Sequence, residues 1–232
     1  MRLQKFIAKA GYCSRRRAEK LILDGKVSVN GQIITQLGTK VDPEKDKISI
    51  ENTLLTLEKD LVYILLNKPK GYVTSCSHPG EKIVLELLDI SQRVYPVGRL
   101  DKDSTGLLLL TNDGKLHLQL THPSFDHEKE YLVTVAEPIS QTALNSLKKG
   151  IQILGTQTRP ALIKRISATK FKIILKEGKN RQIRRMVKKV GNRVTDLKRI
   201  RMANIRLGKL PEGKWRYLNE TEKKVLSANF LK

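Results

Sequence analysis

The sequence predicts an α+β protein built in two parts. In residues 1–60, two short helical patterns precede a strand-like run that ends in an Asn-Gly turn. In residues 61–232, strand-like and helix-like segments follow one another without regular alternation. Irregular order favours a mixed, largely antiparallel sheet flanked by helices over a doubly wound parallel sheet. We therefore expect a small helix–helix–hairpin domain followed by a larger α+β domain.

The first 25 residues predict two short helices. Apolar residues at helical spacing run from Leu3 to Ile7, and Gly11 is placed to end that helix. Ser14 is placed to cap a second helix, because its hydroxyl can accept a hydrogen bond from an N–H group of the first turn. Gly25 would end the second helix.

The second helix carries three consecutive arginines in its first turn: Arg15, Arg16 and Arg17. Positive side chains at a helix N-terminus oppose the helix dipole, so a purely structural helix would rarely place them there. Contact with phosphate groups explains the arrangement better. We expect these arginines to bind a nucleic acid.

A hairpin and a linker are expected next. Residues 27–29 alternate as a strand does, and Asn30-Gly31 is a strong signal for a hairpin turn. A second short strand is expected over residues 48–50. Residues 51–60 look like a linker, which places the boundary of the first domain at residue 60.

From residue 61 onward the sequence is rich in strand-like segments. Strands are expected at residues 62–66, 94–97, 107–110, 131–135, 161–166 and 170–175. Helices are expected at residues 83–88, 142–149, 181–190 and 220–227. These segments make up the second expected domain, residues 61–232.

The chain carries a formal net charge of +22 over 232 residues. Residues 164–216 hold 19 Lys and Arg against 3 Asp and Glu, a net charge of +16. A solvated face that only aids solubility would mix both signs, so nucleic acid is the better explanation. An anionic membrane surface is disfavoured, because no strongly amphipathic helix with a large aromatic face occurs.

Several features favour the cytoplasm. No apolar run is long enough to span a bilayer, and residues 1–10 lack the apolar block of a signal peptide. The two cysteines, Cys13 and Cys76, fit a reducing compartment. We therefore expect a cytoplasmic monomer with no membrane partner.

The most unusual loop runs from Gly98 to Gly106 and reads GRLDKDSTG. A carboxylate beside an apolar wall can lose its water and have a shifted pKa, which suits catalysis. Residue chemistry alone slightly favours a plain polar turn, and it does not choose between Asp101 and Asp103. The two aspartates could also bind a divalent metal. No histidine or further carboxylate cluster lies near them in sequence, so no metal is expected.

A second basic stretch, residues 177–190, predicts a helix capped by Asn180. Its apolar stripe leaves Arg184 near the edge, where the side chain could reach inward to a buried carboxylate. Arg181 and Arg185 point further from the stripe and are free to contact phosphates. A solvated basic face is the alternative for some of these residues.

Residues 1–60 resemble the S4 RNA-binding module, a small helix–helix–hairpin domain found in ribosomal proteins, tRNA synthetases and RNA-modifying enzymes. The matching segments read RLQKFIAKAG, CSRRRAEKLI and GKVSVNGQ. The resemblance implies RNA binding but names no reaction.

The larger part resembles the pseudouridine synthases, in particular the branch that modifies ribosomal RNA and often carries an N-terminal S4 module. The matching segments are GRLD at 98–101, GLL at 106–108, TNDG at 111–114, LNKPKG at 66–71, EKEYLV at 128–133 and RQIRRM at 181–186. Several motifs in the family's order are a specific signal. Within the branch, DHEKEY at 126–131, ILGT at 153–156 and GKWR at 213–216 look closest to the large-subunit synthase of subtype F.

The resemblance implies an isomerase that converts a uridine to pseudouridine without a cofactor. It assigns the catalytic role to Asp101, acting on a flipped-out uridine, by attack on the sugar or the base or by assisting glycal formation. Arg184 would hold this carboxylate ionised and oriented. Tyr131 would stack on the uracil, and Arg99 would occupy the space that the base leaves.

The resemblance and the charge pattern together indicate residues that bind RNA. They are Arg15, Arg16, Arg17, Lys68, Arg99, Lys129, Arg181, Gln182 and Arg185. The expected substrate is ribosomal RNA, first of all 23S rRNA, with 16S rRNA or a tRNA as alternatives. Two other classes stay open at this point: a non-catalytic S4-type ribosome-assembly factor, and a metal-dependent RNA enzyme that uses Asp101 and Asp103.

Overall fold

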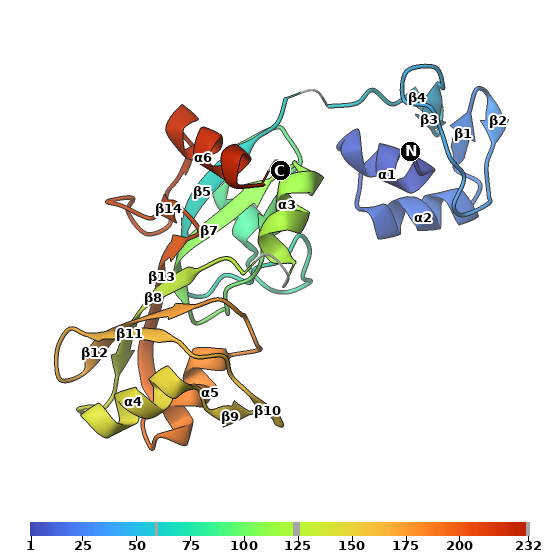
Figure 1. Ribbon diagram of the computed structural model, residues 1–232. Helices are drawn as coiled ribbons and strands as arrows, with labels where there is room; N and C mark the ends of the chain where they lie inside the picture. The colour runs from blue at the N-terminus through green and yellow to red at the C-terminus, as the bar shows by residue number, and fades with distance from the viewer. Residues whose placement is uncertain (59, 123–125, 231–232) are drawn as a thin grey trace. The chain divides into compact units, whose positions relative to one another are not determined.

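The computed structural model describes residues 1–58, 60–122 and 126–230 (Figure 1). Lys59, within the expected linker, lies outside the described residues. The chain divides into two compact units. Residues 1–62 and 90–94 form the N-terminal unit, and residues 63–89 and 95–232 form the larger unit.

The N-terminal unit contains two helices and a four-stranded sheet in the order β2-β1-β3-β4. Its elements are α1 (Leu3–Lys9), α2 (Arg15–Leu23), β1 (Val27–Val29), β2 (Gln32–Ile33), β3 (Ile48–Ile50) and β4 (Thr53–Leu54). The cap predicted for α2 is confirmed, because the hydroxyl of Ser14 accepts a hydrogen bond from the N–H of Arg17 at 3.2 Å. The apolar faces of both helices pack into one core with the sheet.

The expected linker is partly folded, which corrects the prediction for residues 51–60. Glu51 and Asn52 have positive φ angles of 47° and 67° and form a tight turn that returns the chain as β4. Leu55 and Leu57 then pack against the core of the N-terminal unit. The sequence signal was missed because Glu-Asn is a less usual turn pair than Asn-Gly.

The larger unit is built on a mixed, largely antiparallel sheet, as predicted. Its main path runs β11-β12-β8-β13-β7-β5-β15, and only β13 and β7 pair in parallel among the described strands. Its strands are β5 (Tyr63–Lys68), β6 (Tyr95–Val97), β7 (Thr105–Thr111), β8 (Lys129–Val135), β11 (Leu162–Arg165), β12 (Lys170–Leu175), β13 (Val194–Met202), β14 (Ile205–Arg206) and β15 (Trp215–Tyr217). A separate hairpin joins β9 (Gln152–Ile153) and β10 (Thr156–Gln157).

Helices cover the sheet at its two ends (Figure 1). They are the 3₁₀ helix η1 (Val84–Leu87), α3 (Gly114–Thr121), α4 (Gln141–Lys149), α5 (Gln182–Lys189) and α6 (Glu220–Phe230). At one end, Leu147 of α4 and Met186 of α5 pack with Val133 of β8 and Phe171 of β12. At the other end, α3 and α6 contribute to a second core with β5 and β7. The sequence pattern did not reveal α3, although Asp113 caps it by accepting hydrogen bonds from two backbone N–H groups.

Strand β13 lies at the centre of the sheet and was also missed. Two register shifts interrupt its pairing with β8, so its side chains do not alternate cleanly. One of its buried positions is Arg199, whose side chain is only 2% exposed, and a period-2 search for apolar residues does not find it.

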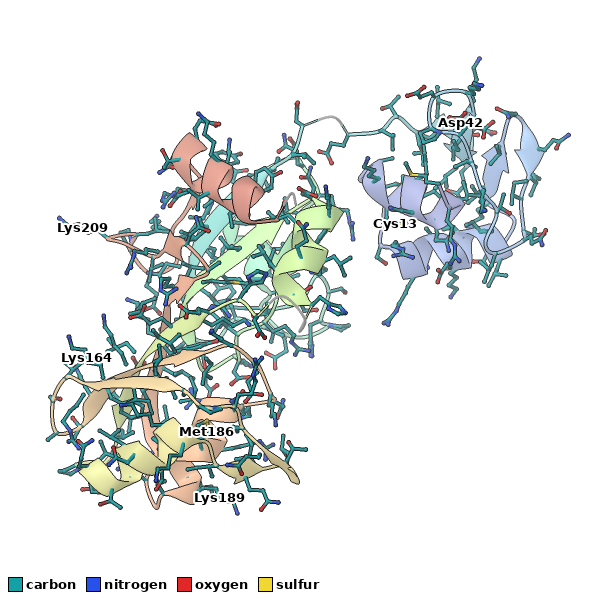
Figure 2. All side chains as sticks on the ribbon, in the orientation of Figure 1. Cys13, Asp42, Lys164, Met186, Lys189 and Lys209 are labelled. Atoms are coloured by element: carbon teal, nitrogen blue, oxygen red, sulfur yellow. The ribbon has the colours of Figure 1, made fainter. Side chains whose placement is uncertain are left out.

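Many basic side chains of residues 164–216 are exposed, among them Lys164, Lys189 and Lys209 (Figure 2). None of the helices in the described ranges is both long and apolar enough to cross a membrane.

Candidate active site

The loop that joins β6 to β7 carries Asp101. Lys68 of β5 holds this loop in place by hydrogen bonds to its main chain. The Lys68 side chain is fully buried, and its Nζ donates hydrogen bonds to the carbonyls of Pro69 at 3.0 Å, Asp101 at 3.1 Å and Ser104 at 2.9 Å. Burial lowers the pKa of the Lys68 ammonium to about 8. Lys68 was predicted to bind RNA. The side chain is enclosed by loop carbonyls and is not among the residues that line the pocket, and its contact with RNA stays a prediction.

The same loop is held on a second side by Thr74. The Thr74 hydroxyl donates to the carbonyl of Leu100 at 2.8 Å and accepts from the Leu100 N–H at 3.2 Å. Both anchors bind main-chain atoms on either side of Asp101. The position of this aspartate therefore depends on the packed sheet below it and not on the loop sequence alone.

Gly106 explains how β7 reaches β13. Its φ angle is +102°, and a Cβ at this position would lie 2.2 Å from the carbonyl oxygen of Arg199. No side chain fits there, so glycine is required where the two parallel strands approach. This close approach brings Arg199 next to the Asp101 loop.

Two arginines at the start of α5, Arg181 and Arg184, contact the aspartates of this loop. Arg181 lies 3.7 Å from the Asp101 carboxylate and donates two hydrogen bonds to Asp103, at 3.2 and 3.1 Å. Arg184 pairs with Asp103 at 3.2 Å and also donates to the Asp103 carbonyl. Arg184 was expected to clamp Asp101. The structure instead places Arg181 beside Asp101 and gives Arg184 to Asp103.

The two arginines determine the charge state of Asp103. Partial burial raises the pKa of this carboxyl, but the hydrogen bond from Arg181 and the charges of Arg184 and Arg181 outweigh burial and hold the pKa below its usual value. Asp103 is thus an anchor that ties the Asp101 loop to α5. The Asp101 side chain is 30% exposed and faces a pocket.

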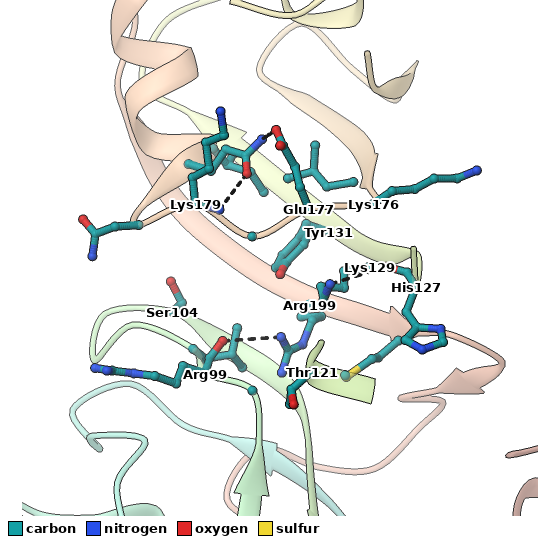
Figure 3. A pocket seen from close by; sticks show the side chains of 18 of the residues that line it. Arg99, Ser104, Thr121, His127, Lys129, Tyr131, Lys176, Glu177, Lys179 and Arg199 are labelled. Carbon is teal, nitrogen blue, oxygen red and sulfur yellow. Dashed lines mark hydrogen bonds between the residues drawn. The ribbon is translucent and has the colours of Figure 1, made fainter. Parts of the chain in front are cut away.

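A pocket of about 780 Å³ opens beside Asp101, within the range typical of small-molecule sites, roughly 300–1,000 Å³. Predicted site residues that line it are Arg99, Asp101, Lys129, Tyr131, Arg181 and Gln182. Figure 3 shows Tyr131, Lys129 and Arg199 next to one another in this pocket. Among the described residues, no group of three or more His, Cys, Asp and Glu side chains is arranged to hold a metal ion.

Arg199 is a pocket residue that the sequence pattern did not reveal. In the β8–β13 register it is the cross-strand neighbour of Tyr131. Its Nε donates to the carbonyl of Leu107 at 2.7 Å and its Nη1 to the carbonyl of Arg99 at 3.5 Å. No spacing signal could have found it, because the strand that carries it was not predicted.

Gln182 and Arg181 shape the start of α5. The Gln182 side chain is 4% exposed; its oxygen accepts from the N–H of Lys179 at 3.0 Å and its amide donates to Glu177 at 2.7 Å. Gln182 therefore fixes the turn before the helix, and it also lines the pocket, so its contact with RNA stays a prediction. Asn180 was the predicted cap, but Arg181 holds that position with a left-handed φ of 49°.

The remaining predicted residues do not line the pocket. Arg185 is exposed and donates to the carbonyl and side-chain oxygens of Asn180. Arg15, Arg16 and Arg17 are exposed on α2 of the N-terminal unit. The pocket thus combines an accessible carboxylate, an aromatic ring and several cations, a set that suits an anionic ligand with a flat base.

Two family models match the chain. The model described as RNA pseudouridylate synthase matches residues 62–189, and the S4 domain model matches residues 1–48. An uncharacterized RNA pseudouridine synthase from Aquifex aeolicus is 41% identical, over 96% of this chain and 92% of that protein.

Two named relatives belong to different types. The dual-specificity RNA pseudouridine synthase RluF of Escherichia coli is 41% identical, over 96% of this chain and 77% of its own length. The ribosomal large subunit pseudouridine synthase B of Bacillus subtilis is 42% identical, over 98% and 96%. A solved structure of a pseudouridylate synthase covers 97% of this chain and 99% of its own, with 34% identity and a TM-score of 0.72.

Proposed function

Because this chain belongs to the RNA pseudouridylate synthase family, we propose that its pocket converts one specific uridine of ribosomal RNA to pseudouridine, with Asp101 as the catalytic residue. The chain is an RNA pseudouridine synthase of the RluB and RluF type, an isomerase with an S4 domain at its N-terminus. This confirms the predicted family. Identities of 41% and 42% do not separate the F type from the B type.

One observation carries the proposal: Asp101 faces the pocket from a loop whose carbonyls Lys68 holds in place. A nucleophile or base must present an ionised carboxylate to the substrate. The guanidinium of Arg181, 3.7 Å from that carboxylate, stabilises its negative charge. A rigid loop also keeps the reacting oxygen in one position, which lowers the entropy lost on reaching the transition state.

The target base must leave its stack to reach Asp101, at a cost of a few kcal/mol. We assign Tyr131 to stack on the extruded uracil, because its ring lines the pocket from β8. Arg99, exposed at the pocket, fills the space that the base vacates, since guanidinium planes stack well on bases. Arg184 acts through Asp103 and positions the loop.

Phosphate contacts come from exposed cations of both units. In the larger unit these are Arg181 and Arg185 at the start of α5. In the N-terminal unit they are Arg15, Arg16 and Arg17 on α2. We propose that residues 1–60 select and hold the RNA while residues 61–232 carry out the reaction, in a monomer that works in the cytoplasm. The proposed target is 23S rRNA, and 16S rRNA or a tRNA is the alternative.

The test uses unmodified ribosomal RNA transcribed with tritium at uracil C5, from which pseudouridine formation releases tritium. We expect release that persists in excess EDTA and disappears in Asp101→Asn. Lys149→Met removes an exposed charge outside both the pocket and the basic stretch 164–216, and it should match the wild-type protein. Release that EDTA abolishes would favour a metal-dependent enzyme. Equal release by Asp101→Asn would rule out Asp101 as the catalytic residue. A pseudouridine map of total RNA with and without the protein then identifies the target.

A further inference from the structure

Two cations lie side by side in the pocket and come from neighbouring strands. Lys129 belongs to β8 and Arg199 to β13. Arg199 is the cross-strand neighbour of Tyr131. Lys129 precedes Tyr131 by two residues, so Lys129 and Tyr131 lie on the same face of β8. Lys129, Tyr131 and Arg199 all line the pocket (Figure 3).

Neither cation has a carboxylate in hydrogen-bond or ion-pair contact among the described residues. Arg199 donates only to main-chain carbonyls, and its buried Nη2 has no acceptor within the described chain. Lys129 makes one long hydrogen bond, 3.4 Å, to the carbonyl of His127. The nearest acidic influence on Lys129 comes from Asp126, whose carboxylate already pairs with Arg159 at 2.9 Å.

Two like charges without a counter-ion are costly in a partly dry pocket. Burial, and next the positive charge of Arg199, lower the pKa of Lys129. A folded protein tolerates such a pair when a ligand supplies the missing negative charge. The pair therefore indicates a subsite for an anionic oxygen.

The position of the subsite favours the base over the phosphate. Arg199 is 2% exposed, next to the ring on which the uracil is proposed to stack. The exposed cations Arg99 and Arg181 are the ones that a phosphate chain can reach from outside. We propose that Lys129 and Arg199 bind the carbonyl oxygens of the extruded uracil and stabilise the negative charge that it acquires on leaving the sugar. This inference rests on the proposed function of the pocket.

The bond changes require such a charge. When the N1–C1′ bond breaks, its electron pair stays on the uracil and spreads from N1 onto O2 and O4. C1′ then bonds to an Asp101 oxygen, or the sugar gives its 2′ proton to Asp101 and becomes a glycal. After the base has turned, C5 bonds to C1′ while the Asp101–C1′ bond breaks or, in the glycal route, while Asp101 returns its proton to C2′. C5 then loses its proton and N1 gains one, so the product is an isomer of the substrate and nothing is consumed. Fixed cations stabilise a spread negative charge well where water is excluded.

Lys129→Met is the primary test, because Lys129 makes one weak contact, whereas Arg199 supports two carbonyls and its loss could disturb the fold. We expect the single-turnover rate of tritium release at saturating protein to fall about 100-fold. RNA affinity should stay within about twofold. Lys129→Arg and Arg199→Lys, which keep the charge, should each retain at least about a tenth of the rate. Lys149→Met, at an exposed position outside the basic stretch 164–216, is the control for loss of one positive charge. Thermal unfolding checks that each variant folds.

The salt dependence of RNA affinity separates base from phosphate. Removing a cation that neutralises one single-stranded phosphate lowers the slope of log affinity against log salt by about 0.7. An unchanged slope with a slow rate supports the inference. A lower slope with an unchanged rate at saturating protein would mean that Lys129 binds phosphate. A wild-type rate in Lys129→Met would exclude any role of Lys129 in the reaction. Either result overturns this inference but leaves the proposed function standing. Absence of release from the unmodified protein would overturn the proposed function and this inference together.

Discussion

The two units of the molecule use positive charge in opposite ways. In the N-terminal unit, Arg15, Arg16 and Arg17 are exposed at the start of α2, and their side chains make no hydrogen bond or ion pair with any described residue. In the larger unit, Lys68 and Arg199 are buried and donate to main-chain carbonyls in and beside the loop that carries Asp101. The exposed cations face solvent, while each buried cation has a fixed set of partners within the fold.

This difference predicts which substitutions matter. An exposed arginine acts through a screened electrostatic field, so its loss costs a little affinity. A buried cation satisfies carbonyls that water cannot reach, so its loss leaves them without a donor. The net charge of +22 thus includes two groups of cations, exposed and buried, that have different roles.

The largest effect is expected from Lys68→Met. The change leaves several loop carbonyls without their donor, and removing one partner of a buried charged network typically costs about 3–5 kcal/mol. We expect a lower free energy of unfolding in urea and loss of tritium release. Lys70→Met is the matched control, because Lys70 is exposed and, among the described residues, its ammonium pairs only with Asp196 at the surface. If both variants were equally stable and active, the anchoring role of Lys68 would be wrong.

The sequence predicted features that depend on neighbouring residues, and it missed the roles of the buried cations, which depend on residues far along the chain. The cap of α2 by Ser14 and the turn at Asn30 depend on residues within a few positions, and both were predicted. The anchoring role of Lys68 was not predicted, because the loop carbonyls of Asp101 and Ser104 that it binds lie 33 and 36 positions further along the chain. Nor was Arg199, since it depends on a central strand that two register shifts obscure.

The contacts of Arg181 and Arg184 with the two loop aspartates show the same limit over a shorter stretch of chain. Helical spacing correctly placed Arg184 at the rim of the apolar stripe of α5. It could not show that Asp103 competes for that arginine, or that Arg181 adopts a left-handed conformation and turns toward Asp101. Side-chain choice between two neighbouring carboxylates is set by the three-dimensional loop, which local pattern does not describe.

A smaller effect is expected from alkaline pH. The pKa of Lys68 is lowered from 10.5 to about 8 in the folded protein, so this ammonium loses its proton above pH 8 while the unfolded chain keeps it until about 10.5. The unfolded state then binds more protons, and the contribution of Lys68 to stability rises with pH between these values. Neutral Lys68 has one donor fewer for the loop carbonyls, so activity should fall above pH 8 while this contribution rises. The test is to measure the rate of tritium release and the free energy of unfolding from pH 7 to 10. A parallel fall of both quantities would contradict the prediction.

The smallest effect on the reaction is expected from replacing Arg15, Arg16 and Arg17 together by alanine. These side chains are proposed to neutralise phosphates and are not among the residues that line the pocket, so the single-turnover rate at saturating protein should stay within about twofold. RNA affinity should fall, and the slope of log affinity against log salt should decrease by about 2–3, because each arginine would leave one phosphate without its cation. A matched triple change of Lys40, Lys45 and Lys47, also in the N-terminal unit, controls for charge alone. If the two triple variants lost affinity equally, the arginines would act only through net charge. If the arginine variant lost rate at saturating protein, the N-terminal unit would take part in the reaction. The contrast between exposed and buried cations would then not hold.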